Sequence, residues 1–86
     1  MDTYRIEWKR SASKELEKLP RPAILKIVSA VDNLSSNPFP QGVRKLAGTE
    51  GTYRIRIGDY RVLYSLIADR LVIEIIRVGH RKEVYR

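Results

Sequence analysis

The chain has 86 residues, enough for one small domain spanning residues 1–86. It contains no cysteine, which excludes disulfide scaffolds, thiolate zinc sites and cysteine nucleophiles. No apolar run approaches the roughly 20 residues of a membrane span, and the charged N-terminus is unlike a signal peptide, so a soluble cytoplasmic protein is predicted. The chain has 17 Lys and Arg against 10 Asp and Glu, and the resulting net charge of +7 indicates a polyanionic partner. No metal or other cofactor is expected.

The first half of the chain predicts one strand and two helices. Apolar and charged residues alternate over residues 4–8, which is the period of a half-buried strand. Ser11 is expected to cap a short helix, in which Ala12, Leu16 and Leu19 face the core. Pro20 ends that helix and Pro22 opens the next one, whose apolar stripe is Ile24, Ile27, Val28, Val31 and Leu34. Residues 35–42 are predicted to form a loop.

The second half predicts a meander of three strands. Apolar residues alternate with arginines over residues 53–57, and a Gly-Asp pair at 58–59 supplies a two-residue turn into a strand over 60–67. A turn at 68–70 leads to a last strand at 71–78. The order β-α-α-β-β-β predicts a small α+β fold, with a mostly antiparallel sheet and both helices on one face. Functional residues are expected on the opposite face.

Arginines concentrate on adjacent strands of this predicted sheet. Arg54 and Arg56 lie on one side of their strand, about 7 Å apart, and Arg61 returns beside them on the next strand. This spacing suits successive phosphates of a single nucleic-acid strand. Further cationic candidates close the last strand, with no carboxylate at matching spacing to pair them: Arg77, His80, Arg81 and Lys82.

Two residues near the end of the chain could take part in chemistry or stacking. His80 is the single imidazole and can act as a base or, once protonated, as an acid. Tyr85 could stack on a nucleic-acid base or pack back on the sheet, and His80 could equally be structural. Trp8 and Tyr64 are expected in the core.

Four segments together resemble the RelE toxins of the RelE/ParE superfamily: K-L-A-G at 45–48, G-T-Y-R-I-R at 51–56, D-Y-R-V-L-Y at 59–64 and V-G-H-R-K-E-V-Y at 78–85. The resemblance covers nearly the whole chain. It implies the toxin of a type II toxin–antitoxin system, which enters the A site of the 70S ribosome and cuts bound mRNA without a metal. The 2′-hydroxyl of the mRNA attacks the adjacent phosphate and leaves a 2′,3′-cyclic phosphate and a 5′-hydroxyl. A RelB-like antitoxin with an acidic segment is the implied partner.

The resemblance also implies roles for individual residues. Arg61 and Arg81 correspond to the arginines that stabilise the phosphate, and Arg81 is a candidate general acid. Tyr85 corresponds to the tyrosine that orients or stacks on the substrate. The expected catalytic residues are Arg61, Arg81, Tyr85, His80 and Arg56.

Arg54 and Arg56 stand where RelE toxins have two lysines near the scissile phosphate. Because arginine cannot be deprotonated in proteins, neither can serve as the general base. They are expected to form an electrostatic cradle for the phosphates, and Arg56 also counts among the catalytic residues. Arg77 and Lys82 are expected as further phosphate ligands. The proton transfers then fall to His80 or Tyr85.

Two other functions share these features. A ParE-like toxin would have the same fold and inhibit DNA gyrase without cutting RNA, and a non-catalytic RNA-binding module would bind single strands and leave them intact. A helix-turn-helix DNA reader is disfavoured, because the second helix is committed to an apolar stripe. An acidic antitoxin segment is expected to cover Arg54, Arg56 or Arg81.

Overall fold

The computed structural model describes residues 3–46, 48 and 50–80. Its elements in chain order are β1 (Arg5–Trp8), α1 (Arg10–Glu17), α2 (Arg21–Leu34), β2 (Arg44–Lys45), β3 (Thr52–Ile57), β4 (Tyr60–Ile67), the 3-10 turn η1 (Ala68–Arg70) and β5 (Val72–His80). The strands form one sheet in the order β1-β5-β4-β3-β2. β1 runs parallel to β5 and the other neighbours are antiparallel. The predicted α+β order is confirmed, with β2 added to it.

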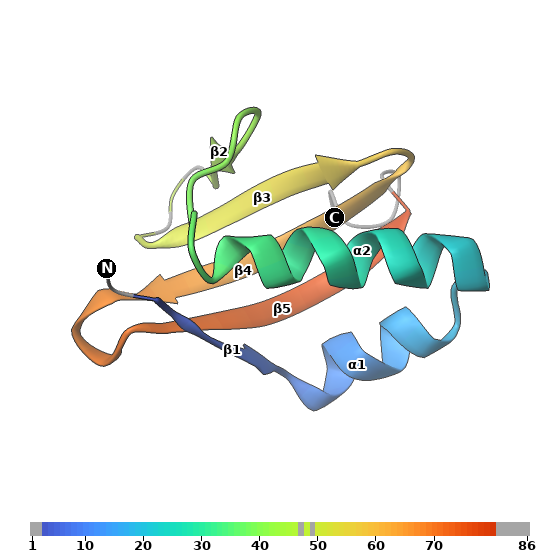
Figure 1. Cartoon of the computed structure of the whole chain (residues 1–86), viewed down its shortest axis with the longest axis horizontal. Helices are drawn as coiled ribbons and strands as arrows, with labels where there is room; N and C mark the ends of the chain where they lie inside the picture. Colours follow the sequence, from blue (N-terminus) through green and yellow to red (C-terminus); the bar gives the residue numbers. More distant parts are fainter. Residues whose placement is uncertain (1–2, 47, 49, 81–86) are drawn as a thin grey trace.

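The core lies between the helices and one face of the sheet, which α2 crosses (Figure 1). The predicted stripe of α2 is confirmed, with Ile24 and Val28 half-buried at its margin. Its buried positions are Ala23, Ile27, Val31 and Leu34. The sheet contributes Val62 and Tyr64 among others, each with 0% of its surface exposed. Burying one aliphatic side chain such as Val62 contributes about 1.5–3 kcal/mol to folding. The contact between α2 and these sheet residues therefore fixes which face of the sheet is covered.

The start of α1 differs from the sequence prediction. The helix begins at Arg10 with Lys9 as its N-cap residue, and no side chain caps it, so the expectation for Ser11 is wrong. The Lys9 N–H donates to the carbonyl of Ile75, 3.0 Å away, which continues the pairing of β1 with β5 into the first helical turn. A tertiary hydrogen bond therefore sets the start of the helix. In α2 the predicted proline is confirmed, since Pro22 lies in the first turn.

The β3–β4 hairpin has the predicted two-residue turn at positions 58–59, and Gly58 takes a φ of 61° there. The last strand differs from its predicted bounds. Leu71 adopts a left-handed conformation with a φ of 53° and belongs to the turn, so β5 starts one residue later and continues to His80.

Tyr64 ties the α2–β2 loop to the core. Its side chain is fully buried, and its hydroxyl donates to the carbonyl of Pro38 at 2.6 Å. Tyr53 lies beside it with 5.8 Å between ring centroids, and Phe39 meets Tyr53 edge-on at 5.1 Å. The expectation that Tyr64 is a core residue is confirmed, and Trp8 packs half-buried against the core.

Burial raises the pKa of Tyr64 from 10.0 to about 12. Because folding favours the neutral phenol, its contribution to stability is complete below pH 10 and is lost as the pH rises towards 12. Replacing Tyr64 with phenylalanine should cost about 1 kcal/mol at pH 8, through the lost hydrogen bond. Between pH 9 and pH 11 the wild-type protein should lose about 1 kcal/mol of folding stability through ionisation of Tyr64, and the Tyr64→Phe protein should be spared this loss. Urea unfolding at these pH values measures both effects.

Tyr53→Phe is the matched control for that measurement, since it leaves the buried hydroxyl of Tyr64 in place. It should keep most of the alkaline loss of stability, because burial is the larger cause of the raised Tyr64 pKa and the neighbouring Tyr53 the smaller one. An equally steep loss in the Tyr64→Phe protein would contradict the expectation.

Candidate functional site

Four arginines meet on the sheet face opposite the helices. Arg44 of β2 pairs with Arg54 of β3, and Arg56 of β3 pairs with Arg61 of β4. Residues paired directly across antiparallel strands share a face, as do residues two apart on one strand. Together with Gly42 these arginines line a surface pocket of about 320 Å³, which we call the arginine pocket.

The electrostatics of the arginine pocket are unusual for a sheet surface. Both cross-strand pairs put like charges directly opposite each other, an arrangement that destabilises a sheet. The described residues that line the pocket include no carboxylate. Arg56 Nε donates to the carbonyl of Gly58 at 3.0 Å, which fixes that guanidinium near the hairpin turn. Such an arrangement is suited to bind a polyanion, which would relieve the repulsion.

Three of the four pocket arginines were predicted from the sequence. The predicted convergence of Arg54, Arg56 and Arg61 on one face is confirmed. Arg44 was missed because β2 has two residues, too few to show any alternation, and follows a loop. The adjacent basic pair at 44–45 was the available signal.

Arg77 differs from its prediction. Its guanidinium lies 3.6 Å from the carboxylate of Glu15 on α1, so a residue distant in the sequence pairs this cation although no carboxylate stands at matching spacing. The reason is that α1 lies beside β5 (Figure 1) and brings a residue from the distant N-terminal half to the strand. Arg77 is not among the residues that line the arginine pocket.

His80 lies on the other face of the sheet from the arginine pocket. It pairs with Tyr60, and their rings meet edge-on with 6.0 Å between centroids. Tyr60 pairs in turn with Ile57, a residue of the helix-covered face. Three further predicted site residues, Arg81, Lys82 and Tyr85, lie outside the described residues.

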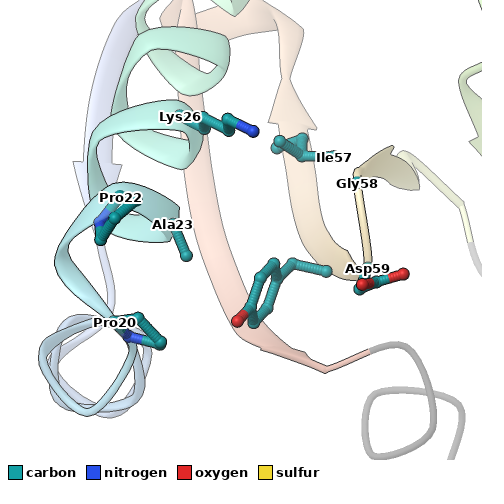
Figure 2. Close-up of a pocket in the computed structure, with 8 residues that line it drawn as sticks. Pro20, Pro22, Ala23, Lys26, Ile57, Gly58 and Asp59 are labelled. Atoms are coloured by element: carbon teal, nitrogen blue, oxygen red, sulfur yellow. The ribbon is translucent and has the colours of Figure 1, made fainter.

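A second pocket, of about 290 Å³, lies on the helix-covered side, between the start of α2 and the β3–β4 turn. Figure 2 shows Pro20, Pro22 and Ala23 on one side of it and the Gly58-Asp59 turn on the other. Its charged lining residues are one lysine, Lys26, and one aspartate. These opposite charges and apolar walls make it a poorer phosphate site than the arginine pocket.

The described residues hold no group of three or more His, Asp or Glu side chains that could bind a metal ion. Among the helices of this part of the chain, none is long and apolar enough to cross a membrane.

Comparison with known proteins gives a consistent result. The family model for the ParE toxin of the type II toxin–antitoxin system parDE matches residues 6–85. Toxin RelG of Mycobacterium tuberculosis is 32% identical over 84 residues, covering 96% of this chain and 97% of the relative. Putative toxin RelE1 of Methanocaldococcus jannaschii is 29% identical, covering 96% of each. The toxin in the archaeal RelE–RelB complex from Pyrococcus horikoshii superposes with a TM-score of 0.83 at 35% identity, covering 94% of this chain and 98% of that one.

Proposed function

We propose that this chain is a metal-independent endoribonuclease of the RelE type. The chain belongs to the RelE/ParE family of toxins from type II toxin–antitoxin systems. Its substrate would be mRNA in the ribosomal A site, and cleavage would stop translation. The observation that carries the proposal is the arginine pocket, where two pairs of like-charged side chains face each other across neighbouring strands. The curated relatives named as RelE or RelG toxins support the same branch of the family.

The pocket suits in-line attack at phosphorus. The 2′-oxygen forms a bond to the phosphorus, and the bond from phosphorus to the 5′-oxygen breaks, which leaves a cyclic phosphate and a 5′-hydroxyl. Negative charge grows on the non-bridging oxygens, and fixed guanidinium donors stabilise it. In this mechanism Arg61 and Arg56 hold the scissile phosphate, and Arg54 and Arg44 hold its neighbours. Arg81 is a further proposed phosphate ligand.

One proton must leave the 2′-hydroxyl and one must reach the 5′-oxygen. Arginines cannot supply the base, so we assign these transfers to His80 or Tyr85, with Arg81 as the alternative acid. The position of His80 on the helix-covered face disfavours this residue as a group that acts inside the pocket. Full cleavage by both His80→Ala and Tyr85→Phe would remove both residues from this role. So few acid–base groups also favour a site completed by the ribosome.

We propose a RelB-like antitoxin as the partner. Complexes of RelE with RelB from Mycobacterium tuberculosis and Pyrococcus horikoshii are among the structures that this chain resembles. An acidic antitoxin segment would complement the arginine pocket and cover Arg54, Arg56 or Arg81. A complex that leaves all three residues uncovered would contradict this arrangement.

The second candidate function is gyrase inhibition without nuclease activity, which the ParE description of the matching family favours. Primer extension on a defined mRNA in a purified translation reaction separates the two, with a gyrase supercoiling assay run in parallel. The RelE assignment predicts cuts confined to A-site codons and supercoiling that proceeds unhindered. Intact mRNA together with inhibited gyrase would replace the nuclease proposal with the ParE one.

A further inference from the structure

Strand β5 lies next to Arg61 but has an irregular register. Leu63 of β4 pairs with Arg77, whereas the next residue, Tyr64, pairs with Ile75, so Ile76 is an extra residue on β5. Such a bulge weakens the ladder locally and re-aims the side chains that follow it. The register beyond the bulge sets Arg61 opposite Gly79 and Tyr60 opposite His80.

The opposite edge of β5 loses its neighbour at the same place. β1 pairs with β5 as far as Trp8 opposite Ile75, and the chain then enters α1. Beyond that point Glu15 of α1 contacts this edge of β5. Its Oε1 accepts a 3.0 Å hydrogen bond from the Val78 N–H, and its Oε2 lies 3.6 Å from the Arg77 guanidinium. One carboxylate therefore contacts two consecutive residues just beyond the bulge.

We propose that Glu15 is a positioning residue for the nuclease site. By holding β5 in register beyond the bulge, it keeps the end of the strand, from Val78 to His80, aligned with Arg61 and its neighbours on β4. A slip of one residue would exchange the two faces of the strand, moving every later side chain away from its place. This role rests on the proposed nuclease function, and it makes Arg77 a partner of Glu15 rather than a phosphate ligand.

The hydrogen bond to Val78 is the contact expected to matter most. The ion pair joins side chains that are 38% and 31% exposed, and exposed ion pairs of this kind contribute little. A backbone N–H at a strand edge, by contrast, needs an acceptor to fix its position. Glutamine keeps such an acceptor without the charge, aspartate keeps the charge on a side chain one methylene shorter, and alanine removes both.

The test combines single-turnover cleavage on programmed ribosomes with amide hydrogen exchange at Val78. Glu15→Ala should lower the maximal cleavage rate by about 10- to 100-fold, the cost of a small misplacement, with little change in the half-saturating concentration. The Val78 amide should exchange at least about tenfold faster. Glu15→Gln should keep the protection and a rate within about threefold of wild type. Glu15→Asp should be slower than Glu15→Gln, and this ranking decides the matter if the alanine protein does not fold.

Glu17→Ala is the matched control, because it removes an exposed carboxylate from the same helix. It should cleave as wild type does. Arg77→Met separates the two roles for that residue: a partner of Glu15 whose ion pair contributes little keeps cleavage close to wild type, whereas a phosphate ligand raises the half-saturating concentration. Two results would overturn the role of Glu15. One is full activity in Glu15→Ala, and the other is a Glu15→Gln protein as slow as Glu15→Ala whose Val78 amide is still protected. A wild-type protein that cuts no mRNA overturns the proposed nuclease function itself, and the positioning role with it.

Discussion

Replacing Arg61 with alanine should slow mRNA cleavage by about 100- to 1000-fold, the typical contribution of one fixed donor to a developing oxyanion. Arg61 is part of the arginine pocket, and its Nε is shielded from solvent, so its charge is screened less than that of an exposed arginine. The substitution also removes one of two like charges that face each other across β3 and β4. Folding stability should therefore change little, and the melting temperature should stay within about 3 °C of wild type.

Two variants bracket that result. Arg61→Lys keeps a positive charge but loses the planar, two-pronged donor, so its rate should fall between wild type and alanine. Arg70→Ala removes an exposed arginine from η1, past the other end of β4, and should cleave as wild type does. Single-turnover cleavage on programmed ribosomes measures all three rates. If Arg61→Ala and Arg70→Ala cleave equally well, Arg61 does not stabilise the transition state.

Local sequence patterns accounted for most of the elements. Helical spacing located α2, and alternation with a Gly-Asp turn located the β3–β4 hairpin that brings Arg56 opposite Arg61. Both signals act within about ten residues of chain, a range over which periodicity directly reports which side is buried. The start of α1 could not be found in this way, because a hydrogen bond from Lys9 to Ile75 fixes it.

The bulge in β5 is a feature of the fold that the sequence did not predict. Strict alternation from Ile73 and Ile75 would send Arg77 towards the core. The extra residue Ile76 reverses the alternation, so Val78 and His80 share the helix-covered face, and Arg77 pairs with Leu63 on the other. A single inserted residue leaves no mark in the composition of the strand. The Glu15 contacts were equally hidden, since they depend on α1 lying beside β5.

The affinity of the protein for a short single-stranded RNA should depend steeply on salt. If the four pocket arginines each neutralise one phosphate, the logarithm of the association constant falls with the logarithm of salt concentration at a slope of about −2.8. Affinity would then drop about 50-fold between 50 and 200 mM salt. Fluorescence anisotropy with a labelled oligonucleotide measures this slope without the ribosome, so it tests the interface separately from cleavage.

The same titration assigns individual contacts. Replacing Arg44 and Arg54 together with glutamine should reduce the slope to about −1.4, because two fewer counterions are displaced when RNA binds. Arg70→Gln removes an arginine outside the arginine pocket and should leave the slope unchanged. Because Arg44 pairs directly with Arg54 across β2 and β3, a normal slope in the double variant would mean that RNA does not enter the pocket from the β2 side. A reduced slope with cleavage still confined to the A site would instead place flanking phosphates on these two arginines and the reacting phosphate at Arg56 and Arg61.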